Sequence, residues 1–151
     1  MDSVKSSENS KKSSEIFRYD LQILERHLDT LGHVNNATYL QILEEARWDF
    51  ITCRGFGLNV VQERGLAPII LELQVKYRRE VRNRQLIWVE SQCHHHEDGK
   101  IRIYVEQKIF GEAHGPGRPT TEASFVMGTI DLQRRKIVIP PPEFMQAMGL
   151  S

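Results

Sequence analysis

The sequence has two cysteines, no long hydrophobic run and no excess of charge of either sign. Cys53 and Cys93 lie far apart in apolar surroundings and lack CxxC spacing, so we expect reduced structural thiols rather than a disulfide or a catalytic nucleophile. No apolar stretch approaches the ~18 residues that a membrane-spanning helix needs. Twenty Lys and Arg balance twenty Asp and Glu. This neutral total argues against a protein that binds nucleic acid through bulk positive charge.

The chain length of 151 residues suits one domain. Residues 1–14 contain almost nothing that can be buried, so we expect a disordered N-terminal tail. They also lack the apolar stretch of an export signal, which favours a cytoplasmic location. We expect the folded domain over residues 15–140. Residues 141–151 then form a C-terminal tail in which Met145 and Met148 pack against the body.

Hydrophobic periodicity predicts one long helix among several strands. Apolar residues recur at helical spacing from Tyr39 to Phe50 and cover most of the circumference, which predicts a largely buried helix from Asn36 to Gly55 or Gly57. Alternation with a period of two predicts strands at 16–24, 69–78, 86–93, 101–109 and 123–132 and a hairpin turn at Asp98-Gly99. This order predicts an α+β fold in which an antiparallel sheet wraps one helix. A second copy of the subunit would complete the cover of the helix.

The segment LDTLGHVNNATYLQILEEAR, residues 28–47, carries the most chemical information. Asp29 and His33 stand in a loop directly before the helix, where unpaired backbone N–H groups and the helix dipole stabilise negative charge. Asp29 can activate water or attack a carbonyl there, while the N–H of Asn36 or Asn35 receives the oxyanion. The alternative is structural: Asp29 caps a turn, Gly32 allows a positive φ, and His33 is an ordinary loop residue.

A resemblance to a known family favours the catalytic interpretation. The string Asp29-x-x-Gly32-x-Val34-Asn35-Asn36-x-x-Tyr39, followed by Glu44-x-Ala46-Arg47, resembles the signature of the hotdog-fold acyl-CoA thioesterases, in particular the 4-hydroxybenzoyl-CoA thioesterase and YbgC-like group. The resemblance covers residues 15–140. It implies a curved antiparallel sheet of about five strands around one long central helix. It also implies a homodimer or homotetramer with the active site near the subunit interface.

The same resemblance implies an activity and roles for individual residues. The activity is hydrolysis of acyl-CoA thioesters to free acid and coenzyme A, without a metal or an organic cofactor. Asp29 is then the nucleophile or general base, and the N–H of Asn36 at the start of the helix polarises the thioester carbonyl. Tyr39, within the same string, is a candidate substrate-binding residue.

The loop is also similar to that of plant acyl-carrier-protein thioesterases, whose motif reads Asp-x-Asn-x-His-Val-Asn-Asn. Asp29 and the HVNN string match, but Leu31 stands where that family has a functional Asn. His33 can therefore bind the thioester carbonyl or orient a water, or it can simply pack in the loop. An acyl-carrier-protein thioesterase and a non-catalytic acyl-ligand binder remain as alternatives. Gly32 disfavours a hydratase or dehydratase, whose loop has Pro before its His.

Charged residues elsewhere suggest further roles. Glu44 is a candidate base if Asp29 is inert, or it forms a structural pair with Arg47 three residues later. The basic stretch that includes Arg78, Arg79 and Arg82 suits the phosphates of coenzyme A, or it is a solvated face. The run from His94 to Glu97 suggests a metal site, but successive strand residues point to opposite faces, so we expect none.

Overall fold

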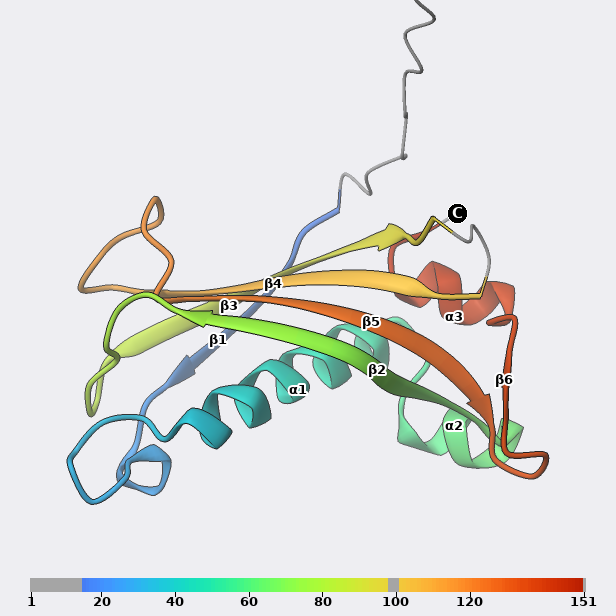
Figure 1. Cartoon of the computed structure of the whole chain (residues 1–151), viewed down its shortest axis with the longest axis horizontal. Helices are drawn as coiled ribbons and strands as arrows, with labels where there is room; N and C mark the ends of the chain where they lie inside the picture. Colours follow the sequence, from blue (N-terminus) through green and yellow to red (C-terminus); the bar gives the residue numbers. More distant parts are fainter. Residues whose placement is uncertain (1–14, 98–100, 151) are drawn as a thin grey trace, which may run out of the picture.

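A six-stranded antiparallel sheet forms the frame of the molecule (Figure 1). The computed structural model describes residues 15–97 and 101–150. The strands follow the order β1-β3-β4-β5-β2, and β6 pairs with one end of β5. In chain order the elements are β1 (Phe17–Gln22), the 3-10 helix η1 (Glu25–His27), α1 (Asn36–Cys53), α2 (Leu58–Arg64), β2 (Leu66–Tyr77), β3 (Leu86–His95), β4 (Ile103–Gly111), β5 (Thr121–Asp131), β6 (Lys136–Val138) and α3 (Pro142–Ala147).

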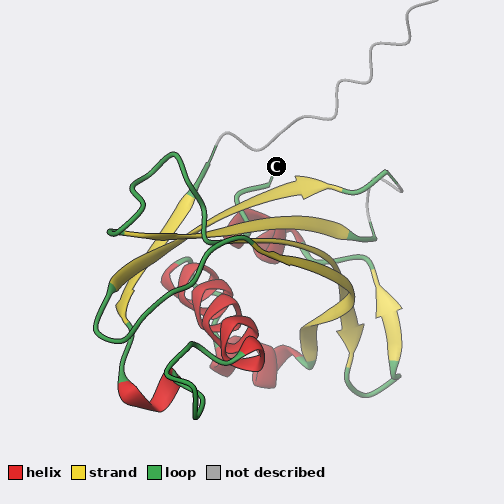
Figure 2. Cartoon of the chain, turned by 60° about the vertical axis from the view of Figure 1, so that its left-hand side comes forward, coloured by secondary structure: helices red, strands yellow, loops and turns green. Residues whose placement is uncertain are grey.

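The sheet curves around α1, as Figure 2 shows. Val89, Val105 and Ile109 point from the sheet into the core and are fully buried. Ile42 and Leu43 meet them from the helix and are equally buried. The expected hotdog architecture is therefore confirmed, with β6 as a short additional strand. None of the described helices is long and apolar enough to span a membrane.

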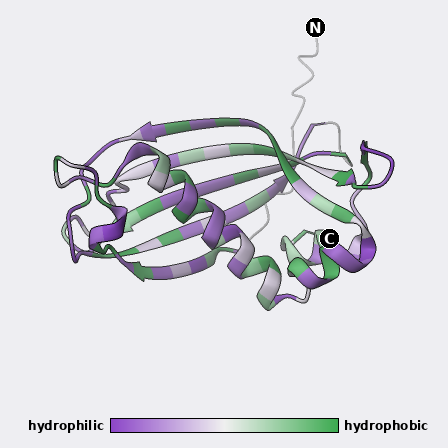
Figure 3. Ribbon diagram, turned by 90° about the horizontal axis from the view of Figure 1, so that it is seen from below, coloured by the Kyte–Doolittle hydropathy of each residue, from purple (hydrophilic) through white to green (hydrophobic). Residues whose placement is uncertain are grey.

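Helix α1 begins as the sequence predicts and has one exposed polar face. Asn35 is its N-cap, and the Asn35 side chain accepts a hydrogen bond from the N–H of Ala37. The opposite end is Cys53, just before the expected glycines. The helix is not apolar nearly all round: Glu45 and Asp49 are exposed, and hydrophilic bands interrupt the hydrophobic ones along the ribbon (Figure 3). The expectation that apolar residues cover most of the circumference was therefore wrong, because the carboxylates between Tyr39 and Phe50 face solvent.

Strand β2 forms one edge of the sheet. It begins at Leu66, three residues before the expected start, and it includes Pro68. Proline is tolerated here because an edge strand has one side without ladder hydrogen bonds. The register with β5 shifts between Ile70 and Glu72. Leu73 near the middle of the strand is 49% exposed, so this edge presents apolar surface.

Two short α-helices were not predicted from the sequence, nor was the 3-10 helix η1. Helix α2 lies between the expected long helix and the expected strand at 69–78, and α3 lies within the segment expected as a tail. Phe144 of α3 is buried, and its ring packs against that of Phe56 with centroids 4.9 Å apart. Met148 is buried and Met145 partly buried, which confirms that both methionines pack against the body. The expected disorder of residues 1–14 and the Asp98-Gly99 turn lie outside the described residues.

Both cysteines are free, as expected, but their environments differ. Cys93 is completely buried on β3, and burial raises the pKa of its thiol to about 12. Cys53 is exposed at the end of α1, so the expectation of apolar surroundings was wrong for this residue.

Candidate active site

A short loop that turns back on itself precedes α1. Its ends meet in a bridge between Leu28 and Val34, and the N–H of Asp29 donates to the carbonyl of His33 at 2.8 Å. The Asp29 carboxylate fixes the turn, because its Oδ1 accepts from the N–H groups of Leu31 at 2.9 Å and His33 at 3.2 Å. The second oxygen, Oδ2, has no hydrogen bond within the described part of the chain. The half-buried carboxylate therefore keeps one oxygen available for chemistry.

Gly32 supplies the backbone conformation that this turn requires. Its φ is +80°, in the left-handed region that residues with a Cβ rarely adopt. The N–H of Gly32 donates to the carbonyl of Asp29 at 3.2 Å, which closes the turn. The sequence expectation of a positive φ at this position is confirmed.

The two asparagines that follow form the start of α1. The N–H of Ala37 is shared by Asn35 Oδ1 and Asn36 Oδ1, each at 2.9 Å. The N–H of Asn36 itself donates to no acceptor in the residues that the structure describes. An exposed donor at the positive end of the helix dipole can receive an oxyanion.

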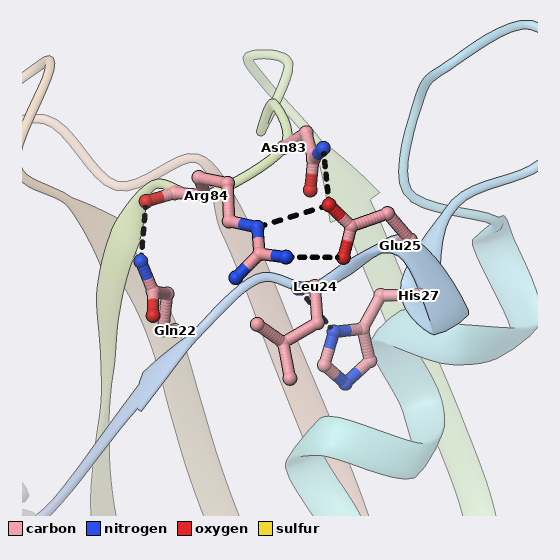
Figure 4. A network of polar contacts seen from close by, with 6 residues as sticks. All are labelled: Gln22, Leu24, Glu25, His27, Asn83 and Arg84. Atoms are coloured by element: carbon pink, nitrogen blue, oxygen red, sulfur yellow. Dashed lines mark hydrogen bonds and ion pairs between the residues drawn. The ribbon is translucent and has the colours of Figure 1, made fainter.

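A polar network fixes the chain that enters this loop (Figure 4). Glu25 of η1 accepts two hydrogen bonds from the guanidinium of Arg84, at 2.9 and 2.8 Å, and a third from Asn83. Gln22 donates to the carbonyl of Arg84 at 3.0 Å. These contacts tie the end of β1 to the loop before β3, so the chain before the Asp29 loop has a defined position.

His27 lies at the base of the loop and is buried. Its Nδ1 accepts a hydrogen bond from the N–H of Leu24 at 2.8 Å, and its carbonyl accepts from the N–H of Asn35 at 3.2 Å. Burial lowers the pKa of His27, and the positive charge of Arg26 lowers it further. The neutral ring therefore holds the start of η1, and the backbone carbonyl of His27 holds Asn35.

Tyr39 and Tyr77 connect the first turn of α1 to the end of β2. Their rings lie 5.1 Å apart, and the hydroxyl of Tyr77 donates to the carbonyl of Asn36 at 3.2 Å. Tyr39, a predicted substrate-binding residue, is only 7% exposed, and burial raises the pKa of its hydroxyl. Tyr77 was not singled out from the sequence because its alternation with neighbouring residues indicated an ordinary strand position.

The basic stretch after β2 lies beside the same loop. His33 Nε2 is 3.3 Å from Glu80 Oε1, and Glu80 Oε2 is 3.7 Å from Arg82. Glu80 thus links the loop before α1 to the basic segment. The arginine side chain of Arg82 is 75% exposed, so it is free to meet an anionic ligand.

The other two predicted coenzyme-binding arginines have partners within the chain. Arg78 Nε lies 2.9 Å from a carboxylate oxygen of Glu122, and Arg79 Nη1 donates to the carbonyl of Pro119 at 2.7 Å. Both arginines also donate their backbone N–H groups to the carbonyl of Thr120. These contacts anchor the segment and make Arg82 the most available of the three cations.

Glu44 lies on the exposed side of α1, away from the loop. Eight residues separate it from Asn36, which corresponds to about 12 Å along the helix axis. The expected ion pair between Glu44 and Arg47 is not formed within 4.0 Å in the described residues. Arg47 instead donates to Gln107 of β4 at 2.8 Å, because its side chain turns inward toward the sheet.

The histidines at the end of β3 form no cluster with the geometry of a metal site. His94 is buried with its Nε2 3.0 Å from Glu106 of β4. Within residues 15–97 and 101–150, no group of three or more His, Cys, Asp or Glu side chains is placed to hold a metal ion.

Comparisons with known proteins agree with this architecture. The chain is 33% identical over 110 residues to the long-chain acyl-CoA thioesterase FadM of Escherichia coli, covering 73% of this chain and 80% of FadM. It is 28% identical over 130 residues to the acyl-acyl carrier protein thioesterase ATL3 of Arabidopsis thaliana, covering 86% of this chain and 66% of ATL3. The crystal structure of YbaW, a probable thioesterase from Escherichia coli, superimposes with a TM-score of 0.73 at 26% identity and covers 88% of this chain and 96% of YbaW.

The fold and these relatives define the class of hotdog thioesterases, enzymes that hydrolyse thioesters. Residues 24–148 match the family model of the Thioesterase-like superfamily. The chain belongs to that superfamily.

Proposed function

We propose that this protein hydrolyses acyl-CoA thioesters to free acid and coenzyme A, with Asp29 as the acting carboxylate. One observation carries the proposal: Asp29 keeps a free oxygen in a loop that leads directly to the unpaired N–H of Asn36. A carboxylate and an oxyanion donor are the two groups that acyl transfer requires. The long-chain acyl-CoA thioesterase among the relatives supports coenzyme A as the carrier.

Two routes are open to Asp29. In the first, its oxygen attacks the thioester carbonyl, the C–S bond breaks, coenzyme A leaves as a thiolate, and water hydrolyses the resulting anhydride. In the second, Asp29 takes a proton from water, and the hydroxide attacks the same carbon. The N–H of Asn36 stabilises the oxyanion in both routes, with the Asn35 side chain holding the first turn of the helix. Neither route requires a metal or an organic cofactor.

His33 and Tyr39 have supporting roles in this proposal. His33 is about half exposed beside Glu80, so its ring can orient a water or contact the thioester carbonyl. Tyr39 packs on Tyr77 and shapes the wall next to the helix start. Glu44 is the candidate base only if a variant without the Asp29 carboxylate keeps its activity.

Coenzyme A phosphates are assigned to the segment that contains Arg78, Arg79 and Arg82. This segment lies next to the Asp29 loop through the His33 and Glu80 contact. Arg82 has the most exposed guanidinium, and guanidinium groups suit phosphate oxygens. Arg78 and Arg79 are held by Glu122 and Pro119 and contribute positive potential rather than a free side chain.

The proposal includes a homodimer or homotetramer, formed through β2. This strand ends at Tyr77 beside the start of α1, and its edge presents apolar side chains with no strand beyond it in the described chain. A second copy that adds its own β2 would satisfy the backbone groups of the edge and bring its surface next to the candidate site. A cytoplasmic location, expected from the sequence, is part of the same proposal.

Thiol release from a panel of acyl-CoA thioesters of increasing chain length tests the function, with the same acyl groups on acyl carrier protein in parallel. We expect release from acyl-CoA. Thiol release from the acylated carrier protein alone would show that the substrate is acyl carrier protein rather than acyl-CoA. The plant relative supports this alternative. Saturable binding of acyl-CoA without release would instead identify a non-catalytic acyl-ligand binder.

A further inference from the structure

Arg47 is a charged residue placed inside the core. It is 9% exposed, and its Nη1 donates to Gln107 Oε1 at 2.8 Å. Gln107 is completely buried, and its amide nitrogen donates to Ser91 Oγ at 2.9 Å and to the carbonyl of Leu43 at 3.1 Å. These two bonds fix the amide so that its oxygen faces Arg47. The guanidinium also lies over the ring of Phe125, 4.3 Å from the centroid. Its position is therefore fixed from two sides.

The charge of Arg47 has little compensation in the chain. Burial lowers its pKa to about 10, so the side chain is still a cation at neutral pH. No carboxylate oxygen in residues 15–97 and 101–150 lies within 4.0 Å of it, and Glu44 acts only at longer range. A buried cation of this kind is costly unless it is hydrogen-bonded and paired.

The remaining N–H groups of Arg47 are open. Among the described residues, three side-chain nitrogen and oxygen atoms are inaccessible to solvent and have no hydrogen-bond partner: His94 Nδ1, Thr121 Oγ1 and Thr129 Oγ1. No nitrogen of Arg47 is among them, yet the guanidinium has one hydrogen bond. Its free N–H groups are therefore accessible to solvent.

Arg47 lines a cavity of about 170 Å³ between α1, β2, β5 and α3. Arg47 and Glu44 provide its charged groups, and Trp48, Met127, Phe144 and Met148 contribute apolar side chains to its wall. A cavity of ~150 Å³ can hold a molecule the size of benzene. The site therefore fits a small apolar group that bears one acceptor oxygen.

We propose that Arg47 binds an acceptor oxygen at the far end of the substrate's acyl group. This proposal rests on the proposed thioesterase function. The preferred acyl groups are then oxygenated chains, with a terminal carboxylate bound best because a guanidinium donates two parallel hydrogen bonds to it. Arg47 is a specificity residue here and takes no part in cleavage of the thioester.

The spacing along α1 sets the length of such an acyl group. Eleven residues separate Asn36 from Arg47, which corresponds to about 16 Å along the axis. An extended chain covers about 1.2 Å per bond, as the three bonds of one backbone residue cover 3.6 Å. The acceptor oxygen of the acyl group would then lie roughly a dozen bonds from the thioester carbon. The subsite at Arg47 is therefore distinct from the oxyanion position at Asn36.

A binding experiment on the full chain tests the subsite without requiring turnover. The probes are benzoate, benzyl alcohol and toluene, which share a ring but differ in the acceptor oxygen. We expect benzoate to bind about tenfold more tightly than toluene and to shift the side-chain N–H signals of Arg47 in NMR spectra, with benzyl alcohol in between. Toluene binding as tightly as benzoate, or benzoate leaving those signals unmoved, would overturn the proposal.

Variants give a second test. Arg47→Met should reduce the ratio of benzoate to toluene affinity to about one, and Arg47→Lys, which keeps the charge but loses the planar fork, should give an intermediate ratio. The matched control is Arg54→Met, an exposed arginine at the end of the same helix. A control that lowers the ratio as much as Arg47→Met would contradict the assignment. If Arg47→Met does not fold, the Arg47→Lys variant and the NMR signals of the wild type still test whether Arg47 binds the acceptor oxygen.

The catalytic readout compares dodecanoyl-CoA with its ω-carboxylate counterpart. We expect kcat/KM to favour the ω-carboxylate in the wild type by about tenfold, this preference to disappear in Arg47→Met, and an intermediate preference to remain in Arg47→Lys. Equal values in the wild type would remove Arg47 from substrate selection. A protein that hydrolyses neither ester while still binding benzoate through Arg47 would refute the thioesterase proposal and leave the subsite in place.

Discussion

Asp29 Oδ1 accepts a hydrogen bond from the backbone N–H of His33 at 3.2 Å. The same oxygen accepts from the N–H of Leu31, so a single carboxylate oxygen holds the turn and leaves Oδ2 outside it. The structural and catalytic interpretations of Asp29 are therefore compatible, because each uses a different oxygen. This division allows the two roles to be separated by mutation.

Asp29→Asn should abolish thioester hydrolysis and keep the fold. The amide oxygen can still accept from Leu31 and His33, but an amide is neither a nucleophile nor a base at neutral pH. Asp29→Ala should also lose activity and in addition lose about 1 kcal/mol of stability, since two N–H groups lose their acceptor. Thiol release and urea unfolding measure the two effects. Full activity in Asp29→Asn would exclude Asp29 and direct attention to Glu44.

Arg82→Ala should raise KM for acyl-CoA by about two- to fivefold, as expected for one exposed ionic contact, with little change in kcat. Arg78→Ala should have a smaller effect, because Glu122 already neutralises that side chain. The same variants assayed with an acylated short thiol, which lacks the phosphates, should behave like the wild type. Arg134→Ala is the matched control, an exposed arginine at the opposite end of β5. An equal rise of KM for both thioesters would remove Arg82 from coenzyme binding.

Acid should destabilise the protein partly through His27. Burial holds the pKa of this residue below its ordinary value of 6.5, so the unfolded chain takes up a proton at a higher pH than the folded one. The stability associated with neutral His27 is complete above 6.5 and decreases as the pH falls toward the lower folded pKa. His27→Asn keeps an acceptor for the Leu24 N–H but cannot titrate, and should show a smaller loss between pH 7 and 5 in urea unfolding. Identical losses in variant and wild type would show that His27 is not responsible.

Leu73→Lys should convert the proposed oligomer into monomers. Leu73 is half exposed on the edge strand β2. A lysine at this position in both copies would bring two positive charges together at an apolar interface, and their repulsion would separate the copies. Size-exclusion chromatography with light scattering measures the mass in solution. Ile137→Lys is the control, since Ile137 is 45% exposed on β6 and away from the β2 edge. A wild-type monomer at micromolar concentration, or an unchanged mass in Leu73→Lys, would contradict dimerisation through β2.

The main elements of the fold follow from local patterns in the sequence. Asn35 and Asn36 determine where α1 begins, because their side-chain oxygens accept from the N–H of Ala37. This capping involves neighbouring residues only, so the sequence is enough to predict it. The alternation in β3 and β5 determines which side chains face the core. The short helices escaped prediction because their stability depends on packing: Phe144 is buried against Phe56, a residue distant in the sequence.

The candidate site divides in the same way. The sequence by itself determined the loop with Asp29 and Gly32 and its place before α1, since turn chemistry and helix capping act over a few residues. Only the tertiary structure decided that Tyr77 and Glu80 contact that loop and the start of α1. It also decided that Arg78 pairs with Glu122, and that Arg47 turns toward Gln107 rather than Glu44. The physical reason is that these contacts link strands and loops far apart in the chain, and their geometry depends on the curvature and register of the whole sheet.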